Sequence, residues 1–81
     1  METFGIRGGP HAGAEHPDGG AQLETAARRV GARFLSHTAD GIGFVVDAAS
    51  APDAMAVATE VFRPVFGDRW WAEVASTGYL N

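Results

Sequence analysis

The chain of 81 residues contains no cysteine and no lysine. Without cysteine it forms neither disulfide bonds nor thiolate metal sites, and the usual remaining way to stabilise so short a domain is association with a second copy. All six basic residues are arginines, they are scattered along the chain, and the net charge is −4. A surface of this kind does not favour nucleic acid or an anionic membrane. We therefore expect a homodimer and neither of those two partners.

Long apolar runs are also missing. The amino-terminal segment METFGIRGG has neither the basic start nor the long apolar stretch of a signal peptide, so we expect a cytoplasmic protein. The glycine pairs at 8–9 and 19–20 do not form a phosphate-binding loop, and there is no G-x-S-x-G motif. Nothing in the sequence indicates a cofactor.

The middle of the chain predicts a hairpin. Two apolar runs, at about 32–38 and 42–48, flank the dipeptide Asp40-Gly41. Both central residues of a type I′ turn need positive φ, which Asp and Gly tolerate, so we place the turn at this dipeptide.

A helix is predicted directly after the hairpin. Ser50 is a suitable cap, and the Asp53 carboxylate three residues later can meet free N–H groups of the first turn. Apolar residues then recur at helical spacing. Pro64 should end or kink the helix, with Gly67 as a stop.

The two ends of the chain complete a single domain, 1–81. Residues 2–7 alternate weakly and predict a short first strand, a flexible Gly- and Pro-rich loop follows at about 8–20, and helical spacing indicates a helix at about 20–30. The run at about 69–76 predicts a last strand, and residues 78–81 a surface tail.

The resulting order is strand, helix, strand, strand, helix, strand, which is that of the ferredoxin-like split β-α-β arrangement, an α+β fold. It predicts a four-stranded antiparallel sheet with strand order 4-1-3-2 and with two helices on one face. The other face is left uncovered. Packing that face against a second subunit would give a dimeric barrel.

The stretch GARFLSHTADGIGFVVDAASAPDAMAVA, followed by a closing WAEVA strand, resembles the small dimeric α+β barrel proteins, especially their uncharacterised short bacterial members. The likeness covers roughly residues 31–76. It implies a homodimer and small-molecule chemistry of an isomerase, cyclase or cofactorless-oxygenase kind. The long Gly-rich loop after the first strand departs from typical members, so no site residue is carried over.

Strand alternation predicts which side chains share the uncovered face. Counting back from the turn places Arg33, Leu35 and His37 on the helix-covered side. Trp71 is preferred to Trp70 on the uncovered face, because the same alternation keeps Glu73 out of the core. We expect that face to bind a small apolar or aromatic molecule, and its candidate residues are Asp47 and Glu73 as acid or base, with Arg7, Phe34, Ser36, Val45 and Trp71 as ligand-binding residues. A cross-strand ion pair of Arg7 with either carboxylate is the plainer interpretation.

The three histidines give two further hypotheses. A one-residue slip of the hairpin would move His37 onto the uncovered face, where it would be the best acid or base candidate. His11 and His16 flank Glu15 in the loop, and imidazole with carboxylate is a ligand set for zinc or nickel. Three functions therefore stay open: a small-molecule enzyme or binding protein, a non-enzymatic dimerisation or interaction module, and a metal-binding protein.

Overall fold

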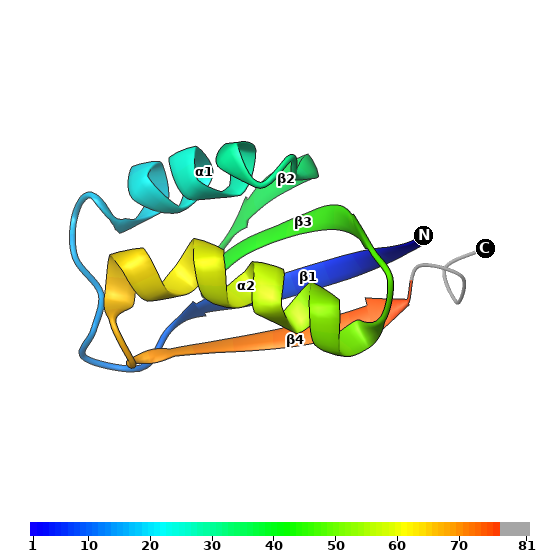
Figure 1. Cartoon of the computed structure of the whole chain (residues 1–81). Helices are drawn as coiled ribbons and strands as arrows, with labels where there is room; N and C mark the ends of the chain where they lie inside the picture. The colour runs from blue at the N-terminus through cyan, green and yellow to red at the C-terminus, as the bar shows by residue number, and fades with distance from the viewer. Residues whose placement is uncertain (77–81) are drawn as a thin grey trace.

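The computed structural model describes residues 1–76, which form a four-stranded antiparallel sheet and two helices (Figure 1). The elements in chain order are β1 (Glu2–Pro10), α1 (Gly19–Arg29), β2 (Arg33–Thr38), β3 (Gly41–Ala48), α2 (Ala51–Phe66) and β4 (Trp70–Ser76). The strands lie in the order β2-β3-β1-β4. The predicted α+β class, element order and strand order are confirmed, and the predicted tail at 78–81 lies outside the described residues.

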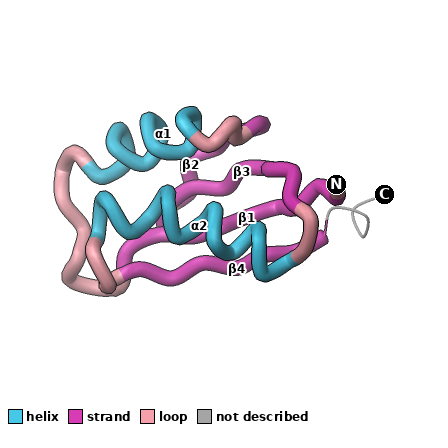
Figure 2. The backbone as a smooth tube through the Cα atoms, viewed as in Figure 1, coloured by secondary structure: helices cyan, strands magenta, loops and turns pink. Residues whose placement is uncertain are grey.

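Both helices cover the same face of the sheet, and the core lies between them and the sheet (Figures 1 and 2). Alternate residues of the central strands point into this core, among them Phe4, Ile6 and Phe44. Phe62 of α2 has no exposed surface, and its ring stacks on that of Trp70 with 5.6 Å between the centroids. Burying a side chain of this size contributes about 1.5–3 kcal/mol.

Helix α2 begins where the sequence predicts but runs past its proline. The Ser50 hydroxyl accepts a hydrogen bond from the Asp53 N–H at 3.3 Å, which caps the first turn. The helix continues through Pro64 to Phe66 and is capped by Gly67, so the predicted stop at Gly67 is confirmed, whereas Pro64 itself does not end the helix. Pro64 has no N–H to donate to the Glu60 carbonyl, and both residues are exposed, so water can solvate that oxygen. Neither described helix is long and apolar enough to cross a membrane.

The hairpin turn lies one residue earlier than predicted. Thr38 pairs with Gly41, so the turn is Ala39-Asp40, and neither of these residues has a positive φ. The type I′ prediction is therefore wrong. Gly41 is instead the first residue of β3, where a side chain would overlap the Gly8 carbonyl oxygen of β1. Relative to the predicted hairpin, the residues of β2 next to the turn pair with residues of β3 that lie an even number of positions from those expected. Because side chains alternate between the two faces with a period of two, His37 stays on the helix-covered face and does not move to the other one.

Strand β1 extends to Pro10, so the first part of the predicted loop is strand. A Cβ placed on Gly8 would lie 2.7 Å from Cζ of Phe62, and one on Gly9 would overlap the Asp40 carbonyl oxygen. The two glycines therefore let α2 and the hairpin turn pack closely against β1.

The edge strand β2 contains a β-bulge. Its register shifts between Arg33 and Ser36, where β2 has one residue more than β3. Phe34 lies in this bulge, outside the regular ladder, with φ +52 and 83% of its surface exposed. The alternation used to place β2 side chains fails here: Arg33 pairs with Val45 and lies on the helix-free face, the side of the sheet away from both helices.

Candidate functional site

The helix-free face carries an ion pair between Arg7 of β1 and Glu73 of β4. The two residues are cross-strand partners, and the guanidinium donates to the carboxylate at 2.6 Å. The guanidinium also lies 5.9 Å from the centroid of the Trp71 ring. Trp71 and Glu73 thus face the helix-free side as predicted, whereas Trp70 packs against the core. Both charged side chains are mostly exposed, so such a pair contributes about 0–1 kcal/mol.

Asp47 belongs to a second group on the same face. Arg33 donates two hydrogen bonds to its carboxylate, at 2.9 and 3.0 Å, and the Thr3 hydroxyl donates a third at 2.7 Å. The hydrogen bonds from Arg33 first, and from Thr3 second, lower the pKa of Asp47 from 3.8 to about 2. A general acid or base near neutral pH needs a shift in the opposite direction. The geometry therefore favours a structural ion pair for Asp47.

The other predicted residues of this face lie between the two groups. Ser36 pairs with Gly43, which in turn pairs with Arg7. Val45 is the next outward-facing residue of β3 and pairs with Arg33. These positions do not test whether Ser36 and Val45 bind a ligand. Their assignment as ligand-binding residues therefore stays a prediction.

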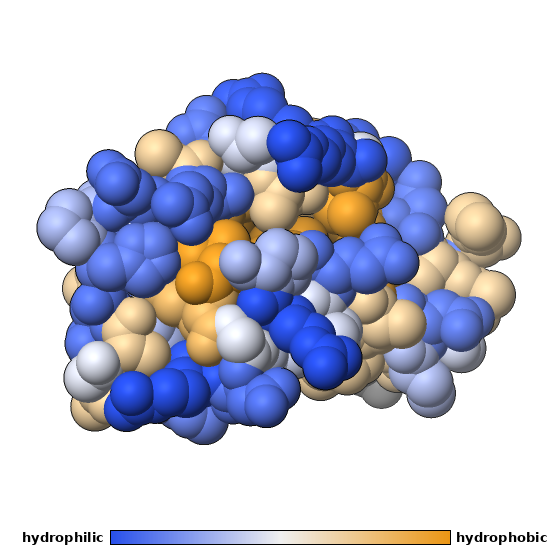
Figure 3. All heavy atoms as spheres, turned by 60° about the vertical axis from the view of Figure 1, so that its left-hand side comes forward, coloured by the Kyte–Doolittle hydropathy of each residue, from blue (hydrophilic) through white to orange (hydrophobic). Residues whose placement is uncertain are grey.

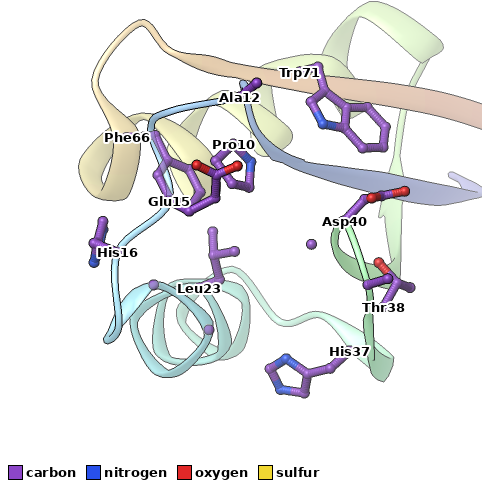
Figure 4. Close-up of a pocket in the computed structure, with 14 residues that line it drawn as sticks. Pro10, Ala12, Glu15, His16, Leu23, His37, Thr38, Asp40, Phe66 and Trp71 are labelled. Atoms are coloured by element: carbon purple, nitrogen blue, oxygen red, sulfur yellow. The ribbon is translucent and has the colours of Figure 1, made fainter.

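A pocket of about 540 Å³ lies at one end of the sheet, where the chain leaves β1 for α1 (Figure 4). We call it the end pocket. Loop residues 12–16, the amino end of α1 and the turn between β2 and β3 surround it, and Phe66 and Trp71 contribute aromatic surface. Figure 3 brings this end of the molecule forward and shows apolar atoms in hollows between hydrophilic side chains. Of the residues predicted as catalytic or ligand-binding, only His37 and Trp71 line this pocket.

The lining combines apolar surface with four titratable side chains. Leu23, Phe66 and Trp71 supply apolar or aromatic contacts, and the His16 ring lies 5.6 Å from that of Phe66. The titratable groups are Glu15, His16, His37 and Asp40. No arginine is among the lining residues within the described part of the chain. The two carboxylates therefore make the pocket unfavourable for an anion.

His37 reaches from β2 to α1 beside this pocket (Figure 4). Its Nε2 lies 3.4 Å from a carboxylate oxygen of Glu24, and the other oxygen of Glu24 accepts from Arg28 at 2.8 Å. The hydrogen bonds with Arg28 and then with His37 lower the pKa of Glu24 below its ordinary value. Glu24 is therefore an ionised partner for the His37 ring at neutral pH.

Neither Glu24 nor the end pocket is predicted from the sequence. Glu24 precedes Arg28 by four residues, which is the spacing of an ordinary helix-surface ion pair. Only the packing of β2 beside α1 brings His37 to it. Asp40 and Phe66 likewise reach the pocket from elements that are distant in sequence.

The loop histidines do not gather into a metal site in the part of the chain described. That part contains no group of three or more His, Cys, Asp or Glu side chains placed to hold an ion. The Glu15 carboxylate accepts a hydrogen bond from the Gly13 N–H at 2.8 Å, and His16 packs beside Phe66. Metal binding through His11 and His16 stays a prediction without geometric support.

Comparison with known proteins adds no further constraint. No family model matches the chain, and neither a curated protein nor a solved structure is significantly similar to it.

Proposed function

We propose that this chain is a small-molecule-binding protein whose ligand occupies the end pocket, on a ferredoxin-like fold of the dimeric α+β barrel kind. The observation that carries the proposal is the pocket itself. Its volume of about 540 Å³ is within the range of about 300–1,000 Å³ found for ligand sites. Aromatic walls with a few converging polar groups are also typical of such sites.

The lining indicates a neutral ligand with an aromatic or apolar part. Phe66, Trp71 and Leu23 would contact that part. The carboxylates of Glu15 and Asp40 would repel an anion but can accept hydrogen bonds from the ligand. A small aryl ketone such as phenylacetone is a suitable probe of this chemistry.

The test blocks the pocket without disturbing the fold. A Cβ on Gly20 would lie 3.8 Å from the His37 ring, an ordinary contact, so Gly20→Leu should project into the pocket and also favour helix formation. Ala56 is an exposed residue of α2 that does not line the pocket, so Ala56→Leu is the matched control. In saturation-transfer NMR we expect phenylacetone to bind the native chain and Ala56→Leu but not Gly20→Leu. Equal binding to both variants would contradict the proposal.

A second candidate function is homodimerisation through the helix-free face. Arg7 with Glu73 and Arg33 with Asp47 are already paired within the chain, so a partner can cover them without leaving an unpaired charge. The small residue Gly43 between these pairs permits close approach of a second sheet. We therefore propose this face, rather than the helix surface, as the contact between two copies.

Sedimentation of a neutral steric variant tests this contact. A Cβ on Gly43 would meet Oγ of Ser36 at 3.6 Å, so Gly43→Gln is sterically tolerated by the monomer. We expect the native chain to sediment as a dimer at micromolar concentration and Gly43→Gln to dissociate, with Ala56→Gln as the unaffected control. A native chain that is monomeric under these conditions would reject the dimer.

A further inference from the structure

We infer that His37 is a general base acting on the molecule bound in the end pocket, and that Glu24 is a positioning residue that fixes the protonation of its ring. The inference rests on the proposed binding function. It adds a reaction class, which the pocket alone does not specify.

The contacts of the His37 ring assign different roles to its two nitrogens. Nε2 faces the Glu24 carboxylate at 3.4 Å, and an ionised carboxylate favours a proton on the nitrogen that faces it. Nδ1 lies 3.8 Å from the place of a Cβ on Gly20, which is part of the pocket wall, and no protein atom within residues 1–76 is hydrogen-bonded to it. In the neutral ring Nδ1 is then an unprotonated acceptor at the edge of the pocket.

Arg28 completes the arrangement behind the histidine. Its guanidinium binds the other Glu24 oxygen at 2.8 Å, which keeps the carboxylate charged and directs its remaining oxygen towards His37. The arrangement is a base, a carboxylate that orients it and a group that anchors the carboxylate. Other histidine bases in enzymes are arranged in the same way, and there the group behind the imidazole selects its tautomer. The contact of 3.4 Å is long, as such hydrogen bonds often are before a ligand binds.

The simplest complete reaction for this pair is a proton shift within one bound molecule. Nδ1 removes a proton from the carbon next to a carbonyl group, the electron pair of the broken C–H bond forms the new C=C bond, and the π pair of the carbonyl group moves onto its oxygen. The imidazolium then returns the proton to that oxygen, which gives the enol. Atoms and electrons balance without a cofactor, oxidant or second reactant.

Other charged groups lie around His37. Glu15, His16 and Asp40 also line the pocket, Glu24 and Arg28 lie on α1, and any of the three lining groups could contribute to a pH profile. The test therefore depends on the protonation state of the His37 nitrogens and on a comparison of variants, not on pH dependence alone.

The first experiment measures the tautomer directly. Long-range proton–nitrogen NMR correlations distinguish protonated from unprotonated ring nitrogens, and the chain has only three histidines. We expect neutral His37 to carry its proton on Nε2 in the native chain. In Glu24→Ala we expect a mixture of tautomers, with His11 and His16 unchanged. A proton on Nδ1, or a His37 spectrum that Glu24→Ala does not alter, would overturn the inference.

The second experiment measures proton removal. Phenylacetone in D₂O gains deuterium at the carbon next to its carbonyl group whenever a base removes a proton there, and NMR follows the exchange. We expect His37→Gln to lower the protein-catalysed rate by about 100-fold and Glu24→Ala by a smaller factor. His11 is exposed and does not line the pocket, so His11→Gln should keep the native rate.

The two proposals fail in distinguishable ways. If phenylacetone binds as proposed but exchanges no faster than in buffer, or exchanges equally fast with His37→Gln, the general base is wrong and the binding function stands. If phenylacetone does not bind to the native chain, both are wrong.

Discussion

The two helices belong to halves of the molecule that are packed to different degrees. Helix α2 has 16 residues, a side-chain cap, and four buried residues against β1, β3 and β4; we call these elements the α2 half. Helix α1 has 11 residues and no side-chain cap within the described chain, and the edge strand β2, which it also contacts, has no buried residue; we call these two elements the α1 half.

This difference indicates where a ligand site can form. The end pocket is bordered by the α1 half, through His37 and the amino end of α1, while Phe66 and Trp71 come from the α2 half. Segments with few buried contacts open and adjust more easily than a packed core. The α2 half therefore serves as the scaffold, and the α1 half supplies the adjustable side of the pocket.

The largest expected effect is the loss of a core side chain from the α2 half. Phe62 is fully buried and stacked on Trp70, so Phe62→Ala should lower the free energy of unfolding by about 4 kcal/mol. Leu23 of α1 is also buried but borders the end pocket, where neighbours can relax, so Leu23→Ala should cost only about 2–3 kcal/mol. Urea titration followed by circular dichroism measures both. Equal costs would remove the distinction between the halves.

Helix capping gives the next effect. Ser50→Ala removes the hydrogen bond to the Asp53 N–H and should lower stability by about 1 kcal/mol. Asp18 occupies the equivalent position before α1 but makes no side-chain cap bond, so Asp18→Ala should change stability little. The same urea titration compares the two variants, and a larger loss for Asp18→Ala would show that α1 is the better anchored helix.

A stabilising change is expected in the α1 half. Phe34 has φ +52, a conformation that costs a residue with a Cβ about 1–2 kcal/mol, and most of its surface is exposed. Phe34→Gly should therefore raise the free energy of unfolding by up to about 1 kcal/mol, after the greater chain entropy of glycine is subtracted. Phe34→Ala removes the same ring without relieving the backbone and is the matched control. The expectation fails if both variants have the same melting temperature.

How much of this structure the sequence predicts depends on how local each signal is. Ser50 and Asp53 act within one turn of helix, and they predict the start of α2 correctly. Regular alternation along β4 places Trp71 and Glu73 on the correct face. The end of α2 is predicted in part: Gly67 follows the last helical residue as expected, but Pro64 does not end the helix, because it is tolerated on an exposed side of the last turns.

Most of the signals that fail depend on contacts between distant segments. Gly8 and Gly41 resemble turn or loop glycines, but each is required by another strand or helix that packs against it. The bulge at Phe34 has no local signature, and it moves Arg33 to the opposite face. The contact between Glu24 and His37 joins residues 13 apart through the packing of α1 beside β2. The candidate site is therefore less predictable than the fold.

The smallest expected effect concerns the ion pair that ties β2 to β3. Because the pKa of Asp47 is about 2 in the folded chain and 3.8 ordinarily, the pair stabilises the fold at pH values above about 4 and loses this contribution as the pH falls towards 2. The pair is partly exposed, so the change is small. A carbon-13 titration of the Asp47 carboxyl should have its midpoint near 2 in the native chain and closer to 3.8 in Arg33→Gln. The native chain should also melt slightly above Asp47→Asn at about pH 6 and no longer do so at about pH 2. A midpoint that Arg33→Gln leaves unchanged would mean that the pair does not hold β2 against the sheet, and the α1 half would then be looser than its hydrogen bonds indicate.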